Sequence, residues 1–253
     1  MVFAAGLGTR LRPITDSMPK ALVPICGKPL LYHTLRKLVD AGCDEIVVNV
    51  HHFPDQIRKY LADNDFSATI HISDESSALL ETGGGILHAR QFLDGSFDAV
   101  RGRGEPFLVH NVDIVSNLDL AWFRDQWKPD ALATLLVSER RTQRYLLFDD
   151  DMRLVGWTNL ATGEVRSPFP ALDPGKCRRY AFAGIHDISP RIFSAFDALG
   201  FSGRFPIMDF YLRACAEYPI YGLAAPGLTL VDVGKIETLA EAETVCRSIV
   251  RRS

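Results

Sequence analysis

The chain has 253 residues, a net charge of −3, 47% hydrophobic residues and 23% charged residues, which are values of an ordinary globular protein. This charge argues against nucleic-acid binding driven by bulk positive charge, and no run approaches the roughly 18 apolar residues of a membrane span. The five scattered cysteines lack Cys-x-x-Cys spacing and the first residues lack a signal-peptide pattern, so a reducing, cytoplasmic environment is expected.

Strands and helices alternate along the chain. The hydrophobic pattern of the first third predicts strands over 1–5, 45–50 and 69–73, and helices over 29–41 and 55–61. The remainder predicts strands over 106–113, 131–138, 180–188 and 229–232, a hairpin over 145–158, and helices over 120–127, 190–199 and following Gly234. This alternation is typical of an α/β fold with a parallel or mostly parallel sheet.

The N-terminal stretch 1–31 contains more candidate ligand-binding residues than any other segment of its length. It combines a short apolar run, a glycine-rich turn and three cations, namely Gly6-Leu7-Gly8, Arg10, Arg12 and Lys20. Glycines let backbone N–H groups approach a ligand, and a helix start behind such a turn favours anions. Guanidinium and ammonium groups suit phosphate oxygens. The stretch therefore predicts a polyphosphate cradle, with a plain structural turn as the alternative. It lacks the features of a P-loop and the third glycine of a dinucleotide fingerprint.

Two carboxylates stand where apolar strands end. Asp113 closes the segment PFLVHNVD, and Asp232 lies in TLVDVGK. In α/β sheets, ligands bind outside the carboxyl ends of strands, and Mg²⁺ prefers hard oxygen ligands. The pair is therefore a candidate metal site that only the fold can assemble, while a cap on the next segment is the alternative for Asp113.

Other polar segments are open to two interpretations. The run ETGGGI at 81–86 predicts a loop that enters a helix at Ile86, because consecutive glycines disfavour a helix interior. Bare backbone there would lie against a flat base. Asp209 begins a helix and either caps it or accepts hydrogen bonds from sugar hydroxyls. The histidines at 51 and 52, the arginines at 140, 141 and 144, and the acidic triplet at 149–151 are interpreted as polar loop residues, a solvated charge run and a turn.

The string AAGLGTRLRPIT, followed by PKALVPICGKPLL, closely resembles the signature of sugar-1-phosphate nucleotidyltransferases, and the resemblance runs from Ala4 to Glu243. It is closest to the short N-acetylmuramic acid 1-phosphate uridylyltransferase type, which lacks a C-terminal β-helix domain. The resemblance implies a single three-layer α/β/α, Rossmann-like domain over residues 1–253 with a central mixed, mostly parallel sheet. The implied reaction joins a nucleoside triphosphate to a sugar 1-phosphate and releases pyrophosphate, as in making cell-wall or surface polysaccharide precursors.

The resemblance also implies roles for residues at matching positions. Catalytic roles fall to Arg10, Lys20 and Asp113, and Mg²⁺ ligation to Asp113 and Asp232. Nucleotide binding is implied for Ala5, Gly6, Gly8, Thr9, Arg10, Glu81, Thr82, Gly83 and Asn111, and sugar binding for Gly184 and Asp209. The ETGGGI run resembles the loop of the uridylyl branch, so UTP is expected, with guanylyl transfer left open. Val112 departs from the family, which has Gly there, and the family usually has a few more residues before Ala-Ala-Gly.

Two rival hypotheses remain on the sequence. The first keeps the chemistry but uses a non-sugar phosphate such as phosphocholine, caged by the aromatic residues Trp157, Tyr180 and Phe182. The second is a non-catalytic regulatory protein that binds nucleotide-sugars, supported by Val112 and the short N-terminus. The expected partners are a nucleoside triphosphate and a sugar 1-phosphate, with no nucleic acid and no membrane. A monomer and a homodimer are both open.

Overall fold

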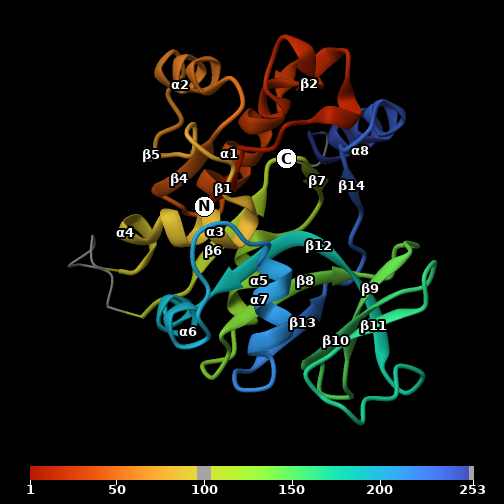
Figure 1. Cartoon of the computed structure of the whole chain (residues 1–253). Helices are drawn as coiled ribbons and strands as arrows, with labels where there is room; N and C mark the ends of the chain where they lie inside the picture. Colours follow the sequence, from red (N-terminus) through yellow and green to blue (C-terminus); the bar gives the residue numbers. More distant parts are fainter. Residues whose placement is uncertain (96–103, 251–253) are drawn as a thin grey trace. The chain divides into compact units, whose positions relative to one another are not determined.

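The computed structural model describes residues 1–95 and 104–250 of the chain (Figure 1). The chain divides into two compact units. The first comprises Met1–Leu79, Val109–Asp125 and Gly227–Ser253, and the second Leu80–Leu108 and Gln126–Pro226. A single domain over residues 1–253 stays a prediction.

The first unit is built on a parallel sheet in the order β6-β1-β4-β5. Its strands are β1 (Val2–Phe3), β4 (Glu45–Val50), β5 (Thr69–Asp74) and β6 (Phe107–Asn111), the last of which begins in the other unit. The residues of β4 after Glu45 are all buried, as expected for an interior strand of a parallel sheet. The predicted strand over 45–50 is confirmed to the residue, and β1 is shorter than the predicted 1–5.

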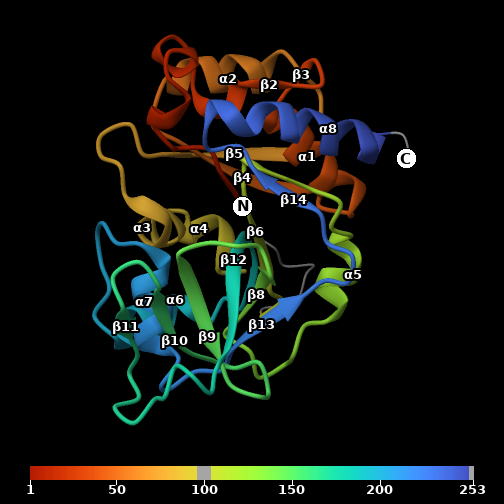
Figure 2. The same cartoon turned by 90° about the vertical axis from the view of Figure 1, so that its right-hand side faces the viewer.

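Helices and short ladders complete the first unit. They are η1 (Thr9–Leu11), η2 (Ile14–Asp16), η3 (Lys20–Leu22), β2 (Pro24–Ile25), β3 (Lys28–Pro29), α1 (Leu30–Asp40), α2 (Pro54–Ala62), β7 (Ile114–Ser116), α5 (Leu120–Asp125), β14 (Leu230–Asp232), η4 (Ile236–Thr238) and α8 (Leu239–Val250). Helix α1 buries Leu31, Leu35 and Leu38 along one stripe, which confirms the helix predicted over 29–41. The C-terminal helix α8 packs against β7, β14 and β2 (Figure 2).

The second unit contains a mixed set of strands. They are β8 (Ala133–Ser138), β9 (Arg144–Phe148), β10 (Leu154–Asn159), β11 (Glu164–Arg166), β12 (Arg178–Ile188) and β13 (Ile220–Ala224). Strand β12 runs antiparallel to β8 and β9, whereas β8 and β13 are parallel. The predicted hairpin is confirmed as β9 and β10. Its acidic triplet forms the turn, because the Asp149 carboxylate accepts the N–H groups of Asp151 and Arg153.

The helices of the second unit are α3 (Glu81–His88), α4 (Arg90–Leu93), α6 (Ile192–Ala198) and α7 (Ile207–Ala214). The expectation of a loop through the three glycines was wrong, because all three lie inside α3 and are buried. The N–H groups of Gly83 and Gly84 donate to the Phe205 carbonyl at 2.9 and 3.1 Å, which satisfies donors that a helix start leaves unpaired. A Cβ at Gly83 would collide with the Phe205 ring, and one at Gly84 with the Gly203 carbonyl. Close packing, rather than a flexible turn, therefore accounts for these glycines.

Within the described residues, no helix combines the length and apolar character that crossing a membrane requires. All five cysteines lie in described residues and none forms a disulfide.

We expect Gly83→Ala to lower the free energy of unfolding by about 1–3 kcal/mol, because the added methyl group must displace the Phe205 ring. Helix propensity acts in the opposite sense, since alanine is favoured over glycine by about 1 kcal/mol in a helix interior. Urea unfolding measures the balance. Gly6→Ala is the matched control, because a Cβ there meets nothing within 4 Å. A Gly83→Ala protein as stable as the wild type would contradict the close-packing explanation of α3.

Candidate active site

The glycine-rich turn follows the short central strand β1. Asn49, at the end of β4, accepts the N–H groups of Ala4 at 2.7 Å and Ala5 at 3.2 Å through its Oδ1. The Ala5 N–H, which the sequence made a candidate phosphate donor, is therefore already engaged. The segment after the turn is the 3₁₀ helix η1, not the α-helix start that the cradle hypothesis assumed.

Gly8 needs to be glycine for two reasons. Its φ of +64° is the left-handed conformation that side chains rarely adopt, and a Cβ there would lie 2.9 Å from the Thr15 Cγ2 atom. Its carbonyl accepts the Leu11 N–H and the Thr15 hydroxyl, both at 2.8 Å. Gly6, by contrast, is exposed and faces open space. The turn is therefore fixed at Gly8 and accessible at Gly6.

Lys20 and Asp113 form an ion pair in the first unit. Lys20 begins η3 and is 8% exposed, and Asp113 follows β6. The ammonium Nζ donates to the Asp113 Oδ2 atom. Two residues that are 93 positions apart and that the sequence assigned to the same chemistry are thus in contact.

Asp232 is brought to the same region by strand pairing. Strand β14 runs antiparallel to β7, with Asp232 opposite Ile114, the residue after Asp113. The Val233 N–H also donates to the Asp113 carbonyl at 2.8 Å. The two carboxylate-bearing residues therefore lie on adjacent chain segments.

Arg10 approaches this pair of segments from η1. Its guanidinium lies against Gly234, where a Cβ would be 2.8 Å from the Arg10 Nη2 atom and 2.9 Å from the Asp232 Oδ1 atom. A side chain at position 234 would thus collide with both groups, so glycine makes room for them. Among the described residues, no group of three or more His, Cys, Asp and Glu could hold a metal. Two carboxylates still fit Mg²⁺, which keeps waters and substrate phosphates in its shell.

Asn111 and Val112 complete the segment before Asp113. Asn111 ends β6 and pairs with Phe3 of β1 in a parallel ladder. Val112, which replaces the family glycine, is 4% exposed and its N–H donates to the Phe3 carbonyl at 3.2 Å. Its φ is not among the positive values of the chain. Valine therefore fits the local backbone, although the family has glycine at this position.

In the second unit, two residues assigned to the nucleotide, Glu81 and Thr82, are hydrogen-bonded to the chain at the start of α7. Arg204 donates two hydrogen bonds to Glu81 Oε1, at 2.9 and 2.7 Å. The Thr82 hydroxyl accepts the Ile207 N–H at 2.9 Å. Glu81 has a φ of +61°, which is strained for a non-glycine residue. Arg204 is a partner that the sequence analysis did not single out.

The residues assigned to the sugar also lie in the second unit. Gly184 interrupts β12 with a φ of +75°, inside a register shift between Phe182 and His186. The helix-cap interpretation of Asp209 was wrong, because α7 starts at Ile207, its N-cap residue is Pro206, and the Ile207 N–H donates to the Thr82 hydroxyl instead. Asp209 instead forms an ion pair with Arg166 at 2.7 Å.

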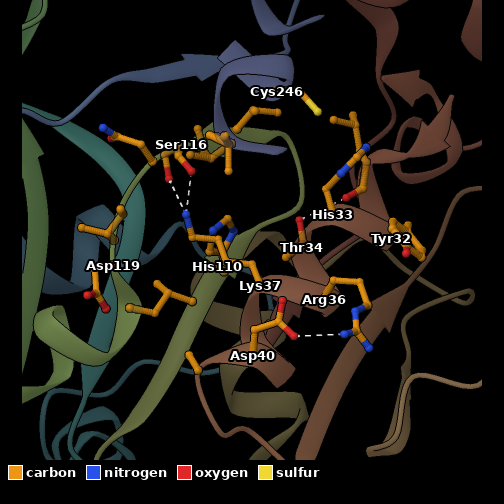
Figure 3. Close-up of a pocket in the computed structure, with 18 of the residues that line it drawn as sticks. Tyr32, His33, Thr34, Arg36, Lys37, Asp40, His110, Ser116, Asp119 and Cys246 are labelled. Carbon is orange, nitrogen blue, oxygen red and sulfur yellow. Dashed lines mark hydrogen bonds and ion pairs between the residues drawn. The ribbon is translucent and has the colours of Figure 1, made fainter. Parts of the chain in front are cut away.

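A separate cavity of about 660 Å³ lies in the first unit, between α1, β7, α5 and α8 (Figure 3). Lys37 of α1 points into it and donates to the Ser116 carbonyl at 2.6 Å and to its hydroxyl at 3.2 Å. Burial lowers the pKa of Lys37 to about 8, and Asp119 opposes this shift. Burial, together with the charge of Lys37, lowers the pKa of His110 to about 3, so this imidazole is neutral at physiological pH. The sequence carried no signal for this cavity.

Comparison with known proteins identifies relatives along the whole chain. The family model described as nucleotidyl transferase matches residues 1–145. The N-acetylmuramate alpha-1-phosphate uridylyltransferase of Caulobacter vibrioides is 33% identical over 256 residues, covering 96% of this chain and 94% of the relative. The enzyme of the same name from Neisseria meningitidis is 31% identical over 249 residues, covering 97% and 96%.

Solved structures show the same fold. A putative glucose-1-phosphate thymidylyltransferase from Bacillus anthracis superposes with a TM-score of 0.75 at 18% identity, covering 98% of this chain and 94% of that one. At this identity the likeness shows the fold alone. It confirms the predicted Rossmann-like α/β class with a mixed, mostly parallel central sheet.

We expect Lys37 to make stability depend on pH. Between pH 8 and 10.5 the unfolded chain holds a proton on this lysine that the folded chain has lost, so the free energy of unfolding rises with pH. Lys37→Met removes this rise. The free energy of unfolding of the wild type minus that of the variant should therefore rise by up to about 3 kcal/mol from pH 8 to pH 10.5. Urea unfolding at several pH values measures it. The exposed Lys28→Met is the control, and a difference that does not change with pH would contradict the burial of the charge.

Proposed function

The chain belongs to the nucleotidyl transferase family, and from this premise we propose that it joins a nucleoside triphosphate to a sugar 1-phosphate, releasing pyrophosphate. The observation that carries the proposal is the gathering of two cations and two carboxylates in the first unit. Lys20 contacts Asp113, Asp232 lies on the paired strand, and Arg10 lies against Gly234. Such a set suits a reaction that must bring two anions together.

In the proposed reaction, an oxygen of the sugar phosphate attacks the α-phosphorus of the triphosphate. A new oxygen–phosphorus bond forms as the bond to the β-phosphate breaks, and pyrophosphate leaves with its electron pair. No protein nucleophile is needed, so the tasks of the residues are positioning and charge stabilisation. Arg10 and the turn at Gly6, Gly8 and Thr9 hold the triphosphate. Lys20 neutralises charge on the reacting phosphates.

Asp113 and Asp232 are the residues that would hold Mg²⁺. Their carboxylate oxygens are ligands of the type this ion prefers, and they lie on adjacent segments through the β7–β14 pairing. When bound, Mg²⁺ supplies positive charge to the phosphates of both substrates. Lys20, bonded to Asp113, orients that carboxylate and balances its charge.

We assign the substrates from the named relatives. Both uridylyltransferases are named for N-acetylmuramate 1-phosphate, so we propose UTP and this sugar phosphate as the substrates. Glu81, Thr82, Gly83 and Asn111 would contribute to the nucleotide side, and Gly184 and Asp209 to the sugar side. None of the five cysteines forms a disulfide, and this fits a cytoplasmic location, which we propose for the enzyme.

A quaternary ammonium acceptor is disfavoured by the surroundings of Trp157. The Arg166 guanidinium lies 6.0 Å from the centre of the indole ring and is paired with Asp209. A cation already beside this ring weakens it as one wall of an aromatic cage for choline. We therefore rank phosphocholine below a sugar phosphate.

The experiment that tests the function measures pyrophosphate release with Mg²⁺. It crosses four nucleoside triphosphates with a panel of sugar 1-phosphates and phosphocholine. We expect release that requires UTP together with N-acetylmuramate 1-phosphate. Release with another pair would keep the reaction and replace the substrates, whereas a folded protein that binds nucleotide without releasing pyrophosphate would favour the regulatory hypothesis.

Lys20→Ala and Asp232→Asn should each reduce turnover by about 10²–10³-fold, because the first removes a positive charge beside the reacting phosphates and the second removes a charged ligand of the proposed Mg²⁺. Both proteins should remain folded, which circular dichroism checks. Lys59→Ala is a matched control, since Lys59 is exposed on α2 and pairs with Asp63. Turnover near the wild-type value in either variant would rule out the role assigned to that residue.

A further inference from the structure

A buried amide and a buried carboxylate lie behind the glycine-rich turn. Asn49 is 2% exposed at the end of β4, and Glu75 is 1% exposed after β5. The Asn49 Nδ2 group donates to Glu75 Oε1 at 2.7 Å. Asn49 lies near the carboxyl end of β4 and Glu75 directly follows the neighbouring parallel strand β5, so the fold places them side by side at one edge of the sheet.

The contact with Glu75 fixes which way the Asn49 amide faces. A carboxylate only accepts hydrogen bonds, so it holds the NH₂ group of Asn49 toward itself. The Oδ1 atom must then face the opposite direction, where it accepts the N–H groups of Ala4 and Ala5. An amide turned the other way would set its NH₂ group against two N–H donors.

Glu75 is itself held by the backbone around it. Its N–H donates to the Val50 carbonyl at 2.8 Å, and its carbonyl accepts from Ala78 at 3.1 Å and lies 2.7 Å from the His51 Nδ1 atom. These contacts fix the backbone from which the buried carboxylate reaches the amide.

We propose that Asn49 and Glu75 are positioning residues for the nucleotide, acting as a relay that sets the backbone of Ala4 and Ala5 at the start of the glycine-rich turn. The proposal rests on the function proposed above and adds two residues to it. Neither side chain touches the reacting atoms. Their effect passes through the two peptide N–H groups that open the turn carrying Gly6 and Gly8.

Exchanging the two groups tests the relay. In Asn49→Asp, one carboxylate oxygen still accepts from Ala4 and Ala5, but the other faces Glu75. Two facing carboxylates need a shared proton, which is lost as pH rises. We therefore expect the ratio of kcat/KM in the variant to that in wild type to fall about tenfold from about pH 6 to about pH 9, mainly through KM for the triphosphate.

The double variant Asn49→Asp/Glu75→Gln should restore the relay. The glutamine NH₂ group donates to the second oxygen of the aspartate, so one hydrogen bond survives with its direction reversed. We expect kcat/KM to return to within about threefold of wild type, with a pH profile of wild-type shape. In a double-mutant cycle this recovery means that the effects of the two substitutions are strongly coupled. The exposed Asn64→Asp is the control for the charge change.

Two results together would overturn the relay: a double variant no more active than Asn49→Asp, and a loss of kcat/KM in Asn49→Asp that does not depend on pH. A loss explained wholly by unfolding would do the same, because kcat and the active fraction would then fall with KM unchanged. Failure of the proposed function is distinguishable. If wild type releases no pyrophosphate, the same four proteins are compared by urea unfolding, where the relay predicts pH-dependent destabilisation of Asn49→Asp and its rescue by Glu75→Gln.

Discussion

The antiparallel pairing of β7 with β14 is the constraint on which the candidate site depends. It joins residues 114–116 to residues 230–232, which are more than a hundred positions apart. Through it Asp232 comes opposite the residue after Asp113, and Gly234 receives the guanidinium of Arg10. The pairing involves only three residues on each strand, so it needs support. Helix α8 provides it by packing on both strands, which makes the C-terminal segment part of the site.

Several glycines of this protein matter because the absence of a Cβ atom makes room for a neighbouring group. Gly234 makes room for Arg10 and Asp232, Gly8 for Thr15, and Gly83 for the Phe205 ring. In each case a missing Cβ allows a close approach, and at Gly8 the backbone also needs a positive φ. The common principle is steric, although the consequences differ. Two of these glycines hold parts of the first unit's candidate site together, and Gly83 closes a helix against its neighbour.

Much of the fold followed from local patterns, because buried strands and amphipathic helices have distinct periods. The strand at 45–50 and helix α1 are examples in which one face or the whole element is apolar. The error at ETGGGI arose because glycine's low helix propensity was weighed without the neighbour that demands it, the Phe205 ring. Asp209 was also misjudged as a possible cap, since its partner Arg166 lies 43 residues away. Contacts of this kind depend on tertiary structure and leave no local signal.

The candidate site could be predicted as a list of residues but not as an arrangement. The sequence assigned Lys20, Asp113 and Asp232 to the same reaction. The fold adds the ion pair and the strand pairing that bring them together. The sequence placed Asn49 at the end of a strand near the expected site, but its pairing with Glu75 was beyond reach, because a polar residue at a strand end is common and only burial makes this pair informative.

The proposed reaction requires the charges of the candidate site to accommodate two anionic substrates. Lys20 and Asp113 neutralise each other in a largely buried contact, so neither leaves an uncompensated charge in the fold. Arg10 remains exposed and can attract phosphate from solution. Asp232 adds a second carboxylate for a cation that would arrive with the triphosphate. In the proposed reaction, Arg10 and the cation that the two carboxylates would hold therefore offset the charge of the incoming phosphates, which is the condition under which two anions can be held close enough to react.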